Sequence, residues 1–545
     1  MSRPNAFFNS LLLNGLLLAG VPTSATAMAA IDKQAMDTLV VCTEASPEGF
    51  DIVQYTAATT ADASAETVFD RLVSFAPGST ELRPGLAERW EISADGLSYT
   101  FHLRQGVKFH HSKTFSPSRN LNADDVLWSF QRQLDPQHPW HKLAGRGFPY
   151  AESMGMATLI ERVEKLDDNT VRFTLKHPEA PFLADLAMGF ASIYSAEYAE
   201  QLLAQGQPDK LNRQPIGTGP FVFERYSKDA QVRFTGNQDY WNGAPKLARL
   251  IFAITADPNV RQQKLQANDC QVALYPRPTD IPALRSDPEL KVLELDSLLI
   301  AYVALNTRHP PLDDVRVRQA INLVFDKNVY LRAQFGEGGA SPAVAPYPPT
   351  LWGHDASLKG WPHNLERARQ LLKEAGQQNG FHLSIWTRPG GGPTNPNPGI
   401  GAQMLQADLA KIGITADIRV YEWGELIKRA KNGEHDLVFM GWAGDNGDPD
   451  NFLTPNLSCA AAASGENQAG WCDPLFDALI QQARQTREQD QRAALYRQAL
   501  AIFHEQAPWI PLAHPKQFSV LRRDVYGFVQ SPMGSNNFSK VKREP

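Results

Sequence analysis

The chain has 545 residues, enough for three or four domains at roughly 150 residues each, and 43% of its residues are apolar, which is ample for large cores. Its 53 Lys and Arg against 59 Asp and Glu give a net charge of -6, so it has no strong positive field to hold nucleic acid or an anionic membrane surface. We therefore expect no nucleic-acid partner.

The first 29 residues have the pattern of a secretory signal peptide. Arg3 precedes an apolar run from Phe7 to Leu18, and Ala25-Thr26-Ala27 has the small-x-small form of a cleavage site. A membrane anchor is the alternative, but it needs about 20 apolar residues, and two asparagines interrupt this run. No cysteine follows the run to carry a lipid. The pattern predicts cleavage after Ala27 or Ala29 and an extracytoplasmic protein that is not anchored to the membrane.

Secondary-structure patterns alternate between strand and helix along the mature chain, which predicts an α/β fold. The helix that begins after Asn364 has that residue as its cap, and Gly376 should end it. In chain order, the expected elements are strands 38–42, 97–103 and 170–175, helices 313–325 and 364–375, strand 383–386, helix 404–412, strands 416–421 and 437–442, and helix 493–503.

A Pro/Gly-rich loop, Arg388–Gly401, separates the expected strand 383–386 from helix 404–412. The backbone of such a loop can approach a ligand closely. A mobile connector is the competing interpretation, and composition alone favours it.

Four cysteines follow the signal pattern, an even and sparse number that is typical of two disulfides, although four cysteines allow three pairings. Cys459 and Cys472 lie 13 residues apart in a Ser/Gly/Asn-rich stretch, so we pair them, which leaves Cys42 with Cys270. A zinc site is the alternative, but the C-x-x-C spacing and nearby histidines that it needs are missing.

Motifs of catalysis and metal binding are missing from the sequence. It has no G-x-S-x-G, H-E-x-x-H, Walker or G-x-G-x-x-G pattern. His110 and His111 are adjacent, so in a strand they would face opposite sides and make a poor metal site; we expect them at the surface. The aspartates between 445 and 450 fail the calcium-loop pattern, because its third and fifth positions are Gly and Pro. We expect no catalytic residue, metal or cofactor.

One acidic residue stands where an α/β protein binds ligands. Asp445 follows the expected strand 437–442, and ligands meet the carboxyl ends of such strands. A carboxylate close to the indole of Trp442 suits an ammonium group, through charge-assisted hydrogen bonds and cation–π attraction. The alternative is a turn-forming aspartate beside a core tryptophan, and the residues alone do not decide between the two.

Longer motifs identify a family. They lie at Glu44–Phe50, Pro84–Leu103, Leu121–Phe130, Pro215–Val222, Val420–Gly433 and Met440–Phe452. In this order, over essentially the whole mature chain, they resemble the family 5 extracellular solute-binding proteins that feed ABC importers, and in particular its dipeptide binders.

The resemblance implies a two-lobed periplasmic-binding-protein fold that closes around its ligand. After the signal peptide 1–29, lobe I would comprise 30–296 and 516–545, with an extra subdomain at about 78–214, and lobe II would comprise 297–515. Each predicted disulfide then falls inside one lobe, as in the family. The resemblance also implies a periplasmic monomer, not an enzyme, that captures di- or tripeptides and delivers them to an inner-membrane ABC permease.

The resemblance assigns roles to particular residues. Asp445 would receive the α-ammonium of the peptide, with Trp442 alongside and Trp423 as another pocket aromatic. Main-chain partners for an extended peptide would come from Thr56–Thr59 and Gly441–Gly444.

The sequence departs from the family at one position. Dipeptide binders have an arginine in the loop matching 388–397 that clamps the ligand carboxylate, and the aligned residue here is Gly392. Arg388 from a shifted loop or Arg146 from the facing lobe are candidates to replace it. Without such a replacement, another solute is the alternative ligand: haem, a metal chelate or an amino-acid conjugate. A secreted peptide hydrolase is a third and weaker alternative.

Overall fold

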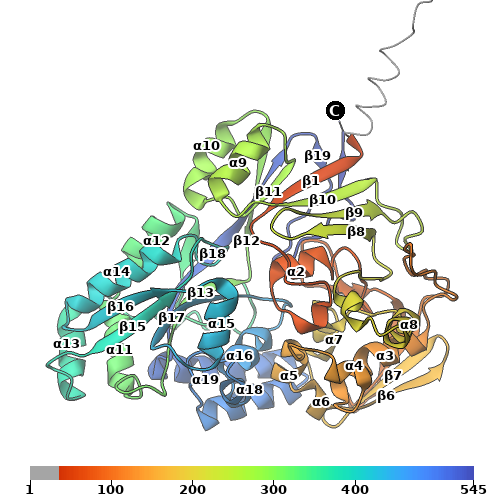
Figure 1. The fold of residues 1–545 in the computed structure, drawn as a ribbon. Helices are drawn as coiled ribbons and strands as arrows, with labels where there is room; N and C mark the ends of the chain where they lie inside the picture. Colours follow the sequence, from red (N-terminus) through yellow and green to blue (C-terminus); the bar gives the residue numbers. More distant parts are fainter. Residues whose placement is uncertain (1–35, 545) are drawn as a thin grey trace, which may run out of the picture.

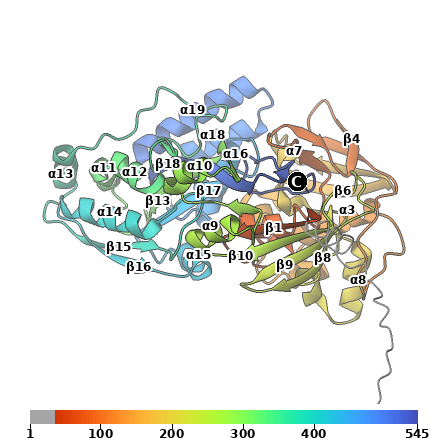
Figure 2. The ribbon, with the colours of Figure 1, turned by 90° about the horizontal axis from the view of Figure 1, so that it is seen from above.

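The computed structural model describes residues 36–544, which form a mixed α/β protein with two lobes (Figure 1). The predicted signal peptide lies outside the described residues. The view from above also separates the two lobes (Figure 2). The predicted two-lobed α/β fold is confirmed.

Two segments connect the lobes. β12 (Leu290–Asp296) is the last strand of lobe I before the chain enters lobe II at β13 (Leu299–Leu305). β18 (Trp509–Arg522) makes the return: its first residues pair antiparallel with β13, and its last seven, from Lys516, pair antiparallel with β12. One strand is therefore part of both lobes.

The main sheet of lobe I is built around β1 (Thr38–Thr43), which confirms the first predicted strand. β1 pairs in parallel with β10 (Arg249–Ile254) and β11 (Val272–Leu274), and β9 (Gln231–Gly236) and β8 (Phe221–Ser227) extend the sheet antiparallel. The helices of this part are α2 (Ala58–Ala63), α9 (Pro258–Gln266) and α10 (Ile281–Ser286), and a terminal hairpin consists of β19 (Val525–Tyr526) and β20 (Lys542–Arg543).

A second, antiparallel sheet forms the extra subdomain of lobe I. Its strands, in spatial order, are β4 (Ala87–Ile92), β5 (Ser98–Leu103), β7 (Thr170–Leu175) and β6 (Ile160–Asp167). The other elements are β2 (Val73–Phe75), β3 (Leu82–Pro84), α3 (Ala123–Leu134), α4 (Pro139–Lys142), α5 (Pro149–Ser153), α6 (Met156–Leu159), α7 (Phe182–Asp185) and α8 (Ala196–Ala204). Helix α3 begins with a capping box between Asn122 and Asp125.

The sheet of lobe II has the order β16-β15-β17-β13-β18. β13 is buried on both faces: Ala301 and Val303 pack into one core, and Ile300 and Tyr302 pack into the other. A strand covered on both faces has a continuous apolar sequence, and LIAYVAL fits this description. The remaining strands are β14 (Ala340–Pro342), β15 (His382–Thr387), β16 (Thr415–Val420) and β17 (Leu437–Ala443).

Helices cover both faces of this sheet. α13 starts at the cap Asn364, whose side chain accepts from the Arg367 N–H, as predicted. The helices of lobe II are α11 (Val315–Val324), α12 (Lys327–Phe335), α13 (Leu365–Glu374), α14 (Pro398–Ala410), α15 (Trp423–Lys431), α16 (Asp450–Leu457), α17 (Cys459–Ser464), α18 (Pro474–Gln485) and α19 (Gln489–Gln506). Every helix within residues 36–544 is too short or too polar to cross a membrane.

The predicted loop 388–401 is shorter than expected, because α14 begins at Pro398 and not at 404. The Asn397 side chain accepts from the Ile400 N–H, and proline suits the first helical position. Gly401 lies inside this helix. The position requires glycine because a Cβ there would lie 2.9 Å from the Phe439 ring. A glycine that composition assigned to a loop therefore serves close packing.

Both predicted disulfides are present. Cys42 is bonded to Cys270, with their Cα atoms 5.8 Å apart, and Cys459 is bonded to Cys472, with Cα atoms 4.6 Å apart. The first bond joins β1 to the segment before β11, and the second closes a short loop of lobe II.

The expected surface position of His110 is wrong. Its side chain is buried, and its Nε2 lies 2.8 Å from the carbonyl oxygen of Gly219. Burial lowers the pKa of His110 to about 4, so the ring is neutral. His111 is exposed, as expected.

Candidate functional site

Asp445 lies where the two lobes meet. It follows β17 of lobe II, and the hydroxyl of Tyr150, on α5 of lobe I, donates to Asp445 Oδ2 over 2.6 Å. The main-chain N–H of Asp445 donates to Asn451 Oδ1 over 2.9 Å, which fixes the turn after the strand. The carboxylate is thus positioned by one contact from its own lobe and one from the other.

The charge of Asp445 is uncompensated within the described residues. Among residues 36–544, no Lys, Arg or His lies within salt-bridge distance of it. Burial raises the pKa of Asp445 to about 7, against the hydrogen bonds from Tyr150 and Asn451 that lower it. Burial and the Asp445 charge raise the pKa of Tyr150, so Tyr150 keeps its proton and is the donor. Such a carboxylate suits a cation supplied from outside.

Trp442 shares two neighbours, Asn451 and Tyr150, with Asp445. Its indole Nε1 donates to Asn451 Oδ1 over 3.3 Å, and its ring centroid lies 6.5 Å from that of Tyr150. The indole is half-buried and packs against the cores of both lobes. Asn451 therefore orients both the indole and the main chain of Asp445.

Along most of its length, β17 is paired with another strand on one edge and not on the other. β13 pairs with it along its whole length, whereas β15 pairs only with its first two residues. The Met440 carbonyl on this edge accepts from Asn395 Nδ2 over 2.8 Å, and because strand groups alternate, the main chain of Trp442 faces the same way. The N–H of Gly444 donates to Leu298 O over 2.7 Å. Gly441 lies against Thr394, where a Cβ would come within 2.2 Å of Oγ1.

Arg388 and Trp423 form a second cluster on lobe II. The guanidinium carbon of Arg388 lies 4.6 Å from the centroid of the Trp423 ring, which is 38% exposed. A Cβ on Gly392 would come within 2.2 Å of Arg388 Nη2, so the guanidinium fills the space beside Gly392. Burial lowers the pKa of Arg388, and the charge of Glu44 opposes this. Within residues 36–544, no carboxylate lies within salt-bridge distance of Arg388.

The predicted residues of lobe I lie on or near its surface. Arg146 is exposed and engaged within lobe I, since Nη1 donates to Glu48 Oε1 over 2.7 Å and the guanidinium lies 5.1 Å from the Tyr55 ring. Thr56 is exposed just before α2, and Thr59 is partly exposed in its first turn.

Gly534 lies between the start of helix α2 and the end of β17. A Cβ on Gly534 would lie 2.9 Å from the Cβ of Ala443 and 3.9 Å from that of Ala58. The segment from Thr56 to Thr59 therefore lies near the end of β17, across the contact between the lobes.

A buried ion cluster joins the lobes at a second place, which the sequence analysis missed. Arg484 Nε, on α18, donates to Glu179 Oε1 of lobe I over 2.6 Å, and Nη2 donates to Met154 O over 3.0 Å. Asn446 Nδ2 donates to Asp185 Oδ1 over 3.0 Å close by. These contacts hold the subdomain against lobe II through the protein's own side chains.

No local pattern marks Tyr150, Glu179 or Arg484, because each meets its partner about 300 positions away in the chain. Asn451 lies inside Met440–Phe452, one of the motifs that carry the family resemblance. Its position six residues after Asp445 could have indicated that it supports this aspartate. Among residues 36–544, no group of three or more His, Cys, Asp or Glu side chains is arranged to hold a metal ion.

Known proteins match nearly the whole chain. A family model described as bacterial extracellular solute-binding proteins, family 5 Middle, matches residues 81–464. Di/tripeptide-binding protein 4 of Pseudomonas aeruginosa is 63% identical over 97% of this chain and 99% of its own. Heme-binding protein A of Haemophilus influenzae is 45% identical over 95% of this chain and 94% of its own. The crystal structure of the dipeptide-binding protein of Pseudoalteromonas sp. SM9913 in complex with Met-Leu has a TM-score of 0.90 and 37% identity, covering 93% of this chain and 100% of that one.

Proposed function

Since this chain belongs to family 5 of the bacterial extracellular solute-binding proteins, we propose that it captures di- and tripeptides between its lobes and presents them to an ABC importer. The observation that carries the proposal is a pair of opposite charges on lobe II, Asp445 and Arg388, without ionic partners among residues 36–544. A free peptide has the complementary pair, an ammonium at one end and a carboxylate at the other.

The ammonium end belongs at Asp445. An α-ammonium there forms a charge-assisted hydrogen bond with the carboxylate, and the Trp442 indole beside it adds cation–π attraction. The Tyr150 hydroxyl, which now donates to Asp445, supplies an oxygen that can accept from the same ammonium. The resemblance to the dipeptide binders supports this assignment, because it gives the aspartate that matches Asp445 the role of receiving the α-ammonium of the peptide.

The carboxylate end belongs at Arg388, because its guanidinium fills the space beside Gly392, the position aligned with the arginine of the family. The stack on Trp423 holds the guanidinium in place. Arg146 is the weaker candidate because its charge is already paired with Glu48.

The two charges follow the ends of neighbouring parallel strands. The pairing of β15 with β17 ends at Trp386 and Val438, and Arg388 and Asp445 come two and seven residues later. Extended di- and tripeptides span roughly 7 and 10 Å, and we propose that a peptide of this length bridges the two charges.

The peptide main chain would lie along the free edge of β17, as an added strand. Trp442 is the best partner there because its main-chain groups face that edge, whereas the Gly444 N–H is already bonded to Leu298. Thr56–Thr59 would contribute from lobe I.

Closure would be the working step, since binding proteins carry out no chemistry on their ligand. A ligand that touches both lobes favours the closed form, which the permease then recognises. We place the lobe boundaries at 296/297 and 515/516, because β18 changes partner between Pro515 and Lys516. We further propose that the protein is a periplasmic monomer, released by cleavage of the signal peptide.

Mass spectrometry of the small molecules that co-purify tests the proposal, followed by calorimetry with Ala-Ala, Ala-Ala-Ala and their C-terminal amides. We expect co-purified peptides of two or three residues and weaker binding of the amides. Peptide cleavage during the incubation would indicate a hydrolase instead.

Haem is the second candidate ligand, because the relative from Haemophilus influenzae named a heme-binding protein is 45% identical to this chain. The same calorimetry with haem, together with the Soret absorbance of the purified protein, separates the two ligands. Haem binding without peptide binding would overturn the peptide proposal.

A further inference from the structure

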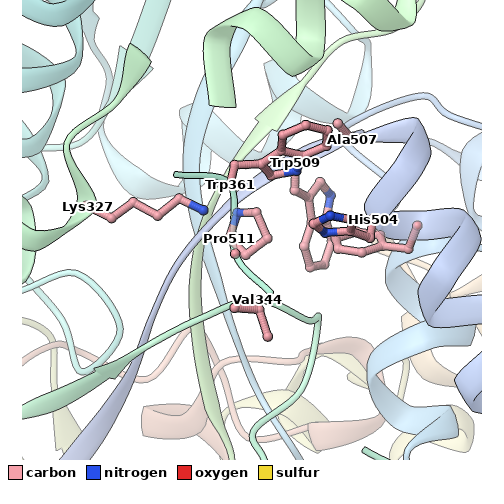
Figure 3. Close-up of a pocket in the computed structure, with 9 residues that line it drawn as sticks. Lys327, Val344, Trp361, His504, Ala507, Trp509 and Pro511 are labelled. Atoms are coloured by element: carbon pink, nitrogen blue, oxygen red, sulfur yellow. The ribbon is translucent and has the colours of Figure 1, made fainter. Parts of the chain in front are cut away.

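Lobe II contains a small cavity away from Asp445 and Arg388. It has a volume of about 10 Å³, room for about one water-sized guest. It lies where the start of α12, the end of α19 and the start of β18 meet (Figure 3). Its walls are Lys327, Val344, Gly360, Trp361, Phe503, His504, Ala507, Trp509 and Pro511. None of these residues is acidic.

Two buried donors in this cavity have no hydrogen-bond partner among residues 36–544: Lys327 Nζ and the indole Nε1 of Trp509. Lys327 extends into the cavity from one side, and His504 lies at the other (Figure 3). Because the cavity has room for one small guest, that guest contacts the groups on both sides.

The other polar groups nearby do not neutralise Lys327. Asp326, its neighbour, accepts from the N–H groups of Asn328 and Val329 as the cap of α12. His504 is stacked on Trp361, and burial lowers its pKa, so it brings no charge at neutral pH. Burial lowers the pKa of Lys327 to about 8, which leaves the amine mostly protonated at pH 7.

We propose that this cavity binds one halide ion, chloride, held by the ammonium of Lys327 and the indole N–H of Trp509. A buried ammonium without a counter-ion is strongly unfavourable, and a second buried donor in the wall of the same cavity also calls for an acceptor. A cavity of this size suits a single-atom anion better than carboxylate, phosphate or sulfate, which have three or more heavy atoms. A single chloride supplies both the charge and the acceptor.

Thermal unfolding at constant ionic strength tests the site. Replacing 150 mM sodium gluconate by sodium chloride should raise the Tm of the full chain by about 1–2 °C, because the ion binds only the folded state. Lys327→Met should abolish the difference between the two salts. Lys359→Met, an exposed lysine next to the cavity wall, should retain it. An equal response of all three proteins overturns the proposal.

Crystals grown in sodium bromide give an independent measurement that does not depend on how the variants fold. We expect an anomalous peak in contact with Lys327 Nζ and Trp509 Nε1, and none in Lys327→Met crystals. A water without anomalous signal overturns the proposal. So does a bromide peak without any chloride-specific shift in Tm, which would mean binding at crystal concentration only.

Discussion

Two carboxylates at the contact between the lobes have opposite surroundings. Glu179 of lobe I is 1% exposed and faces Arg484 of lobe II, over 2.6 Å. Asp445 of lobe II faces lobe I in the same way, but the partner that it meets there is the uncharged hydroxyl of Tyr150. The protein therefore supplies its own cation at one contact and leaves the other for a guest.

The pKa values reflect this difference. Burial raises the pKa of Asp445 to about 7, and no cation among the described residues opposes it. Burial also raises the pKa of Glu179, but the charge of Arg484 acts against that rise. For Arg484, burial lowers the pKa, but Asp450 and Glu179 outweigh this and raise it. We infer that the Glu179 contact stabilises closure, while the Asp445 contact makes closure depend on a ligand.

Removing the ligand-facing carboxylate should have the largest effect. Asp445→Ala leaves the ammonium of a bound peptide without its partner, so we expect peptide affinity to fall by about 2–5 kcal/mol in calorimetry. The matched control is Asp417→Ala, because Asp417 is exposed on β16 and its carboxylate pairs with the exposed His382. Unchanged affinity in Asp445→Ala would remove Asp445 from the site and show that its unpaired charge does not serve the ligand.

Breaking the internal pair should act on closure. Arg484→Met leaves Glu179 buried without its hydrogen-bonded cation in the closed form, whereas in the open form water can solvate it. We expect the free energy of the open form to fall by about 2–4 kcal/mol relative to the closed form. The radius of gyration in solution scattering should then be larger, and peptide binding should be weaker. Arg487→Met is the control, since Arg487 is exposed and donates one hydrogen bond to Ala94 O across the same contact. Equal effects of the two variants would contradict a special role for Glu179.

The role of Arg388, the positive charge of the proposed site, can be tested by comparing peptides that have a free C-terminal carboxylate with their C-terminal amides. Arg388→Met should weaken binding of free dipeptides by about 1–3 kcal/mol and leave C-terminal amides nearly unaffected. Arg146→Met should change neither, because Arg146 is exposed and paired with Glu48. If Arg146→Met has the larger effect on free dipeptides, the carboxylate contact belongs to lobe I.

Much of the fold was predictable because its signals are local. The alternation in 98–103 and 170–175, the cap at Asn364 and the apolar runs before Arg388 and Asp445 depend on neighbouring residues. Helix α14 was predicted to begin too late, because the glycines around Pro398 were read as a loop. His110 was expected at the surface, but a long-range contact with Gly219 buries it.

The site was only partly predictable. Asp445 and Trp442 were indicated by the end of a strand and by the family resemblance, and their contact with a ligand stays a prediction. Tyr150 meets Asp445 from 295 positions away, and Glu179 meets Arg484 from 305 positions away. No local pattern encodes such pairs, because the packing of one lobe against the other decides them.

The raised pKa of Asp445 predicts how binding depends on pH. Below pH 7 the unliganded carboxyl holds a proton, which must leave before an ammonium can pair with it. We expect peptide affinity to be about fivefold lower at pH 6 than at pH 7, about 1 kcal/mol, and to fall again above pH 8, where the peptide ammonium loses its own proton. Calorimetry at pH 6 in buffers of different ionisation enthalpy should detect the proton that Asp445 releases. Stability changes in the opposite direction: between the ordinary range of aspartate and pH 7 only the folded state holds this proton, so the free energy of unfolding falls as pH rises. Asp445→Asn should remove both dependences.

Tyr150→Phe should have the smallest effect and the most specific one. The hydroxyl lowers the pKa of Asp445 by donating to it, so its removal should move the pH midpoint of peptide binding upward. At pH 7 the expected loss of affinity is about 1 kcal/mol or less, and it should shrink further at pH 9, where Asp445 is ionised in both proteins. Calorimetry across this range separates this from a packing defect, since the phenylalanine ring keeps its contacts with Phe190 and Trp442. A loss that is the same at every pH would show that Tyr150 does not tune the pKa of Asp445 from the other lobe, and that its hydroxyl acts through direct contact with the ligand.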